Sequence, residues 1–130
     1  MNYLLDTHVL FWWLEGDKRL GRDRQRLLER CERQGEHVGV AAITAWELAL
    51  LGSARRLAFD CKKLFARVEE LRWIDWLPLT PEVAIEAMRL GAAFHRDPAD
   101  QLIAATARVH GLKLLTADEN IRNSGAVEVI

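Results

Sequence analysis

The chain has few of the residues that could stabilise it by covalent or metal cross-links. Its 130 residues include two cysteines and three prolines, and Cys31 and Cys61 belong to no Cys-x-x-Cys pair and to no group of histidines. This spacing argues against a disulfide framework and a zinc finger, and it fits a reducing compartment. The apolar run at residues 9–14 is too short to span a bilayer, and Asp6 precedes it where a signal peptide would carry basic residues. We therefore expect a cytoplasmic protein.

A strong net charge is also missing. Eighteen Lys and Arg residues face 19 Asp and Glu residues, which leaves a net charge of -1. A polyanion would therefore have to be held by a local basic patch. Half of the residues are apolar and 28% are charged, as in ordinary globular proteins. No repeat or linker divides the sequence, so we expect residues 1–130 to form a single domain.

Short apolar segments alternate with helical patterns along the chain. Strands are expected at residues 3–5, 37–41, 74–79, 112–115 and 127–129. Helices are expected at residues 7–15, 21–34, 45–51 (with Thr44 as the cap), 60–71, 81–94 and 98–110. Strands that are separated by helices pair in parallel through right-handed crossovers. The expected fold class is therefore α/β: a three-layer α/β/α sandwich with a central parallel sheet of about five strands.

Four acidic residues are expected at one edge of this sheet. Asp6 and Asp118 directly follow strands, whereas Glu47 and Asp100 lie in the first turns of helices. Ligand sites of open parallel sheets form outside the carboxyl ends of the strands. The four side chains should therefore come from the same edge of the domain.

Helix capping offers a structural explanation for each acid taken singly. Asp6 and Asp118 could cap the helices that follow them. Thr44-x-x-Glu47 fits a capping box, and Asp100 is favoured near a helix N-terminus. A non-catalytic α/β protein-interaction module whose acids are helix caps is therefore the alternative to an enzyme.

Capping does not explain why four elements present acids to the same edge. Neighbouring carboxylates repel each other unless something neutralises them. Mg²⁺ and Mn²⁺ prefer oxygen ligands, can activate a bound water and can clamp a phosphodiester. The pattern thus favours metal-assisted phosphodiester hydrolysis. A haloacid-dehalogenase-like domain would need a second Asp at position 8, where this chain has His8.

Four motifs together resemble the PIN-domain ribonucleases, and within them the VapC-type toxins of type II toxin–antitoxin systems. They are the segment at residues 2–10 around Asp6-Thr7-His8, the helix with Glu47, Asp97-Pro98-Ala99-Asp100, and Thr116-Ala117-Asp118. The resemblance covers essentially the whole chain. It implies a metal-dependent endoribonuclease that uses Mg²⁺ or Mn²⁺.

The same resemblance assigns roles to individual residues. It implies that Asp6, Glu47, Asp100 and Asp118 are the metal-binding and catalytic acids, with Asp6 and Asp100 as direct ligands. Thr116, Asp97 and Thr7 are supporting residues, and Asp97 is the one more readily explained as a cap. Gln101 stands where many of these proteins carry arginine, so a charge that could brace a carboxylate or contact a phosphate is absent.

The implied partners are an RNA substrate (mRNA or tRNA), a cognate antitoxin whose tail lies over the pocket, and a second copy of the chain. Seven basic residues crowd positions 18–33. The far end of this segment fits a solvated helix face, and Lys18, Arg19 and Arg22 are possible RNA contacts. The pairs Arg55-Arg56 and Lys62-Lys63 are alternatives.

Five tryptophans are many for this length. Core packing is expected for most of them, and especially for Trp46 beside the sheet. One short helix cannot bury Phe11, Trp12 and Trp13 in its own core. Part of that surface is therefore expected to meet a second copy or an antitoxin helix.

Overall fold

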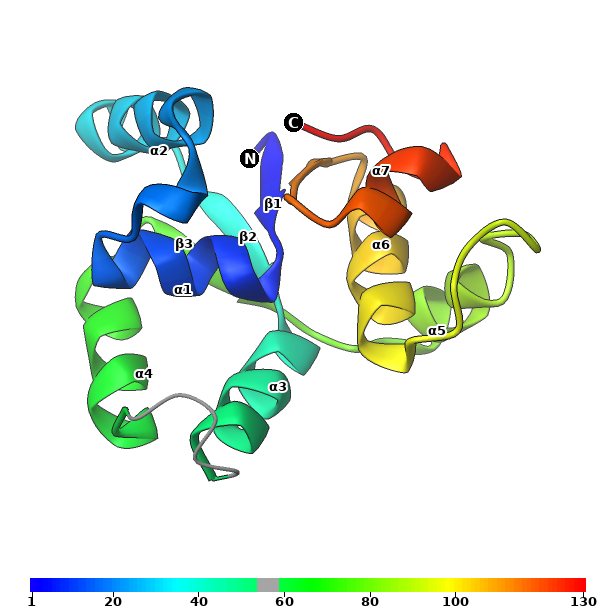
Figure 1. Cartoon of the computed structure of the whole chain (residues 1–130), viewed down its shortest axis with the longest axis horizontal. Helices are drawn as coiled ribbons and strands as arrows, with labels where there is room; N and C mark the ends of the chain where they lie inside the picture. Colours follow the sequence, from blue (N-terminus) through cyan, green and yellow to red (C-terminus); the bar gives the residue numbers. More distant parts are fainter. Residues whose placement is uncertain (54–58) are drawn as a thin grey trace.

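The computed structural model describes residues 1–53 and 59–130 (Figure 1). Arg55 and Arg56, one of the alternative basic pairs, lie outside the described residues. Four strands are present in the described part: β1 (Tyr3–Leu5), β2 (Val38–Ala41), β3 (Ile74–Leu77) and β4 (Lys113–Leu115). The helices are α1 (Thr7–Glu15), the 3-10 helix η1 (Lys18–Leu20), α2 (Arg22–Gln34), α3 (Ala42–Ser53), α4 (Cys61–Glu70), α5 (Pro81–Ala87), α6 (Pro98–His110) and α7 (Glu119–Ser124).

The strands form one parallel sheet in the order β3-β2-β1-β4. Leu5 of β1 pairs with Val40 on one side and with Leu115 on the other. The described residues therefore hold four strands, where the sequence predicted about five. The segment expected as the last strand makes a single parallel bridge, between Leu114 and Val129. Only a few backbone hydrogen bonds join it to β4, among them the bond from the Ile130 N–H to the Leu114 carbonyl at 2.9 Å.

The sheet separates two hydrophobic clusters, and this arrangement confirms the three-layer α/β/α fold. Successive side chains of a strand point to opposite faces, so Leu5 belongs to the cluster under α1, α2 and α4, whereas Leu4 belongs to the cluster under α6 and α7. Figure 1 shows these two groups of helices on either side of the strands. Helix α5 packs on α6 through Val83, Ala87 and Ala105.

Two helix boundaries differ from the prediction. Helix α3 begins at Ala42, directly after β2, so Thr44 is buried inside the helix and is not its cap. Helix α5 ends at Ala87, where the sequence predicted a helix to residue 94. Gly91 has a φ of 93°, which an α-helix does not adopt, and the chain turns so that Leu90 and Phe94 still pack in the second cluster.

Trp46 faces outward from α3. Thr44 and Leu48, four residues apart, share the buried face of the helix. Trp46 lies halfway between them and therefore on the opposite face, where it is 57% exposed. The prediction that Trp46 packs in the core is wrong.

The predicted caps at other helices are confirmed. The Thr80 hydroxyl accepts the Val83 N–H at 3.2 Å, and the Asp60 carboxylate accepts the Lys62 N–H at 2.9 Å. Gly111 ends α6 in the left-handed conformation. Among the residues that the structure describes, no helix is long and apolar enough to cross a membrane.

The three consecutive aromatics of α1 all find contacts within the chain. Phe11 packs on Phe59 with ring centroids 5.2 Å apart, and Trp13 meets Trp73 edge-on at 5.7 Å. Trp12 contacts His8 at 5.7 Å. The aromatic surplus therefore does not by itself require a partner.

Candidate functional site

The topology brings the four predicted acids to one edge of the sheet. The Asp6 N–H donates to the Leu115 carbonyl at 3.1 Å, which joins the ends of β1 and β4. Strands β2 and β3 lie on one side of β1, and β4 lies on the other side. Ligand crevices of parallel sheets open at such a switch point, here between β1 and β4. Helices α3 and α6 start at the same edge. Asp6, Glu47, Asp100 and Asp118 line one cavity of about 200 Å³ together with Thr7, His8 and Asp97.

Asp6 is the most buried of these acids and is held through both carboxylate oxygens. Its Oδ1 accepts the Val9 N–H at 2.8 Å, which caps α1. Its Oδ2 accepts a hydrogen bond from the Thr116 hydroxyl. Burial raises the pKa of Asp6 above its ordinary value, although these hydrogen bonds oppose the shift.

Thr116 connects several parts of the site. Its buried hydroxyl donates to Asp6 and accepts the Asp118 N–H at 3.1 Å. Its carbonyl accepts hydrogen bonds from the guanidinium groups of Arg24 at 2.8 Å and Arg122 at 3.2 Å. Thr116 is therefore fixed from both sides, and it supports two of the predicted acids rather than Asp118 alone.

Glu47 is held by a neighbouring element and does not form the capping box that its sequence spacing suggested. The Thr7 hydroxyl at the start of α1 donates to Glu47 Oε1 at 2.5 Å. Thr7 also contacts the Thr44 hydroxyl at 3.0 Å. Burial raises the pKa of Glu47, and the charges of Asp100 and Asp97 raise it further.

Asp100 has a partner that the sequence analysis missed. Nε2 of His95 lies 2.6 Å from Asp100 Oδ2, and both side chains are mostly buried. Burial raises the pKa of Asp100, and the His95 hydrogen bond opposes that shift. The sequence signal was a histidine close before the Asp97-Pro98 helix start. Gln101 contributes indirectly, because its Nε2 donates to the His95 carbonyl at 3.3 Å.

The remaining two acids cap helices, as the alternative interpretation expects. Asp97 accepts the Asp100 N–H at 3.1 Å, and Asp118 accepts the Ile121 N–H at 2.9 Å. Capping therefore accounts for one oxygen each of Asp6, Asp97 and Asp118. It does not account for Glu47 or Asp100, whose carboxylates contact side chains of other segments.

The donor set of this cavity fits a hard divalent cation. It offers carboxylate oxygens, and no Lys or Arg among the described residues forms an ion pair with any of the four acids. The raised pKa values of Asp6, Glu47 and Asp100 show that their charges are costly in this arrangement. In the described part of the chain, no three His, Cys, Asp or Glu side chains converge closely enough to hold an ion as they stand.

The basic residues near position 20 lie beside the acids. Lys18 and Arg22 line a hollow of about 490 Å³. Arg19 pairs with Asp17 at 2.7 Å and lies over the Trp12 ring at 5.5 Å. Trp12 in turn lines a cavity of about 220 Å³ that shares Asp6, His8 and Asp118 with the acidic cavity. The two cavities that contain Asp6 therefore adjoin each other, and the contacts from Asp17 through Arg19 to Trp12 connect them to the hollow near Lys18.

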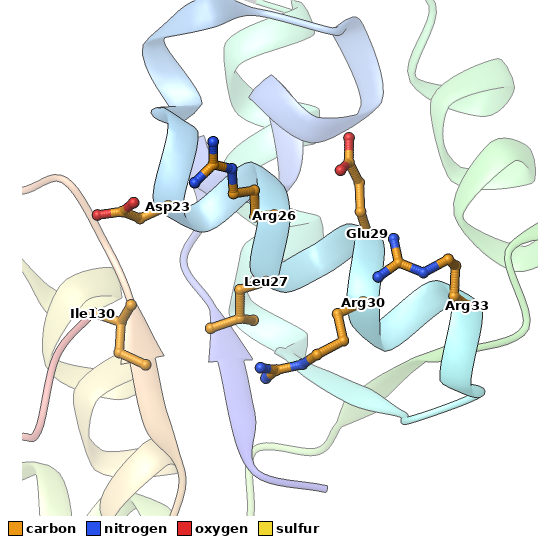
Figure 2. Close-up of a pocket in the computed structure, with 7 residues that line it drawn as sticks. All are labelled: Asp23, Arg26, Leu27, Glu29, Arg30, Arg33 and Ile130. Carbon is orange, nitrogen blue, oxygen red and sulfur yellow. The ribbon is translucent and has the colours of Figure 1, made fainter.

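The far end of α2 has a different character. Figure 2 shows Arg26, Arg30 and Arg33 interleaved with Asp23 and Glu29 around an open hollow of about 500 Å³. Arg30 reaches the Tyr3 hydroxyl at 3.3 Å, and Tyr3 begins β1. This end of α2 thus lies toward the amino ends of the strands, away from the four acids.

Comparisons with known proteins agree with this geometry. A PIN domain model matches residues 3–126. Ribonuclease VapC22 of Mycobacterium tuberculosis (strain ATCC 25618 / H37Rv) is 35% identical over 120 residues, which are 92% of this chain and 89% of that protein.

Two solved structures share the fold over the whole chain. VapBC2 from Rickettsia felis, bound to a DNA fragment from its promoter, matches with a TM-score of 0.71 and 14% identity over 100% of this chain and 98% of that one. DNA-bound VapBC from Salmonella typhimurium matches with a TM-score of 0.71 and 18% identity over 100% and 97%.

Proposed function

Because this chain belongs to the PIN-domain family, with a VapC ribonuclease among its relatives, we propose that it is the endoribonuclease toxin of a toxin–antitoxin pair and hydrolyses RNA phosphodiester bonds with Mg²⁺ or Mn²⁺. One observation carries the proposal: carboxylates from four separate segments line a single cavity without a Lys or Arg ion pair among the described residues. Such an arrangement costs stability unless a cation balances it. An interaction module would have no reason to retain it.

Asp6, Glu47, Asp100 and Asp118 would hold the cation. When bound, Mg²⁺ or Mn²⁺ would lower the pKa of a water and neutralise charge on the phosphodiester. Asp6 is held through both carboxylate oxygens, and Asp100 is fixed by His95. In line with the resemblance to the PIN-domain ribonucleases, we assign these two as direct ligands, with Glu47 and Asp118 acting directly or through water.

The supporting residues fix these carboxylates before a substrate arrives. Thr116 holds Asp6, Thr7 holds Glu47, and His95 holds Asp100. Groups that orient metal ligands in this way typically matter about 10- to 100-fold for metal affinity or activity. Asp97 supports the site by capping α6, which carries Asp100.

The substrate proposal rests on the charge next to the acidic cavity. Arg19 lies over Trp12, which lines the cavity next to the acids, and Lys18 and Arg22 line a hollow with Asp17, the partner of Arg19. Exposed ammonium and guanidinium groups bind RNA phosphates. Gln101 makes a neutral contact with the backbone where relatives often carry arginine, so these residues would supply the positive charge. A substrate such as mRNA or tRNA places the activity in the cytoplasm.

Two protein partners are proposed as well. The neighbouring VapBC structures are complexes, and an antitoxin is the partner that this family membership suggests. Exposed apolar side chains lie on α3 (Trp46, Leu50) and around α5 (Leu79, Ile85, Met88). They provide surfaces for an antitoxin and for a homodimer. We further propose that residues 1–130 act as one domain, since a single sheet joins β1 near the start to the bridge at Val129.

The test is cleavage of a mixed RNA pool by purified, antitoxin-free protein in Mg²⁺, Mn²⁺ or EDTA. The Asp6→Asn variant should lose all cleavage and still fold. Asp60→Asn is the matched control, because Asp60 also caps a helix, α4, but does not line the cavity. Cleavage that persists in EDTA or in Asp6→Asn would contradict the proposal. No cleavage and no Mn²⁺-dependent thermal shift in folded protein would favour the interaction module.

A further inference from the structure

Trp12 occupies an unusual place for a large aromatic side chain. Its neighbours Phe11 and Trp13 pack against Phe59 and Trp73. Trp12 is partly buried, and it lines a cavity with His8, Ala117, Asp6 and Asp118. One part of the indole packs against the first hydrophobic cluster, and another part faces the acidic site.

The indole is also held in place from outside the cavity. Arg19 lies over the Trp12 ring at 5.5 Å, and Asp17 fixes the guanidinium through hydrogen bonds of 3.1 Å and 2.7 Å to its Oδ2. Arg19 does not line the cavity, so the part of the indole that faces the cavity stays accessible. The guanidinium over the ring holds the indole in one orientation, so little conformational freedom is lost when a base stacks on it.

We propose that this cavity is a subsite for one unpaired nucleobase of the RNA, which stacks on Trp12 beside His8. Its volume of about 220 Å³ is enough for one base, which is similar in size to an indole. Aromatic side chains are the usual platform for unpaired RNA bases.

The position of the cavity identifies which base it takes. Asp6, His8 and Asp118 line both this cavity and the acidic one. A nucleotide whose base lies on Trp12 would therefore place its phosphate at the four acids. Every RNA substrate has a base next to the cleaved bond and can therefore fill this cavity. A protein partner does not necessarily have an aromatic side chain at this position. The inference rests on the proposed ribonuclease function for the identity of the ligand.

Binding of a short fluorescent oligouridine is the direct test. Measurements by fluorescence anisotropy use the Asp100→Asn background, so that the RNA remains uncut. Adding Trp12→Ala should weaken binding about 5- to 150-fold, the range expected for loss of one base–aromatic stack. Trp12→Phe should retain most of the affinity. Trp46→Ala is the matched control, because this exposed tryptophan lines neither cavity.

A second ligand separates stacking from a general effect on the fold. An abasic ribose–phosphate chain of the same length has no base, so Trp12→Ala should leave its binding unchanged. Equal losses on both ligands, or no loss on oligouridine, would overturn the subsite. Cleavage by the unmodified protein is measured in parallel. If the protein cleaves RNA but Trp12→Ala does not weaken oligouridine binding, the base subsite is wrong and the ribonuclease function stands. If Trp12→Ala weakens binding but the unmodified protein does not cleave RNA, the ribonuclease function is wrong and the base subsite stands.

Discussion

The hydroxyl of Thr116 donates a hydrogen bond to Asp6, and the carbonyl of the same residue accepts hydrogen bonds from Arg24 and Arg122. Positive charge is thus brought close to the buried Asp6 without forming an ion pair with it. Both oxygens of a paired carboxylate would be less available to a cation. Each Asp6 oxygen instead accepts one hydrogen bond from a neutral group, so it keeps a lone pair that can bind a metal ion.

Replacing Thr116 with valine tests this relationship. The shape of the side chain is kept, but Asp6 loses a hydroxyl donor and the Asp118 N–H loses its acceptor. We expect RNA cleavage at limiting Mn²⁺ to fall about 10- to 100-fold, measured as initial rate against Mn²⁺ concentration. Thr116→Ser keeps the hydroxyl and should remain close to the unmodified protein. Unchanged rates for the valine variant at all Mn²⁺ concentrations would contradict the assigned role.

Arg24 is expected to matter for stability. Its half-buried guanidinium donates to the carbonyls of Leu20, Thr116 and Ile130, and it thereby ties η1, β4 and the last residue together. Arg24→Met keeps an apolar stem but leaves these carbonyls without that donor. The free energy of unfolding in urea should fall by about 2–4 kcal/mol, because hydrogen bonds to charged groups contribute about 1.5–3 kcal/mol each and do not add fully.

The control for this change lies two residues further along α2, on the opposite face of the helix. Arg26 is exposed on the same helix, and Arg26→Met should change the free energy of unfolding by less than about 0.5 kcal/mol. A similar loss in both variants would mean that the removed charge, and not the three carbonyl contacts, sets the stability of Arg24→Met.

The stability of the metal-free protein should depend on pH in a defined direction. Burial raises the pKa values of Asp6, Glu47 and Asp100 above their ordinary 3.8, 4.5 and 3.8, so the folded state binds protons more tightly than the unfolded state. The resulting stability is full below the ordinary pKa values and is lost as pH rises through the raised ones. In EDTA, the stability that these acids contribute should therefore increase as pH falls through their raised pKa values toward 4.5.

Two additions make the pH prediction specific to the site. Asp6→Asn removes one of the three carboxylates and should flatten the dependence. Saturating Mn²⁺ should stabilise the unmodified protein most at pH 7, where the acids are ionised. Metal-free stability that declines steadily as pH falls from 7 toward 5 would contradict the raised pKa values of these acids.

Local signals in the sequence were enough to predict much of the fold and part of the site. Asp6, Asp97 and Asp118 follow strand ends or precede helices, and their caps involve residues within three positions. The contact between Thr7 and Glu47 spans 40 positions. Packing against other elements decides which face of α3 is buried, so the exposure of Trp46 and the Glu47 contact could not be predicted from local signals.

His95 and Trp12 were missed for a similar reason. His95 lies in the irregular segment after α5. The sequence pattern predicted a helix up to residue 94, and a helix ending there would have placed His95 differently relative to Asp100. The sequence did not distinguish Trp12 from its neighbours Phe11 and Trp13. Their different contacts are seen only in the folded structure. Sequence periodicity describes single elements, whereas these residues gain their roles from contacts between elements.

The last prediction concerns His95 as a positioning residue for Asp100. His95→Ala removes the donor at 2.6 Å and should lower kcat for RNA cleavage about 10- to 100-fold with little change in KM. His95→Gln places an amide nitrogen near the position of Nε2 and should restore most of the rate. His37→Ala is the matched control, because His37 forms an equivalent 2.8 Å pair with Asp75 on the exposed surface. A faster His95→Ala enzyme would show instead that the imidazole obstructs Asp100.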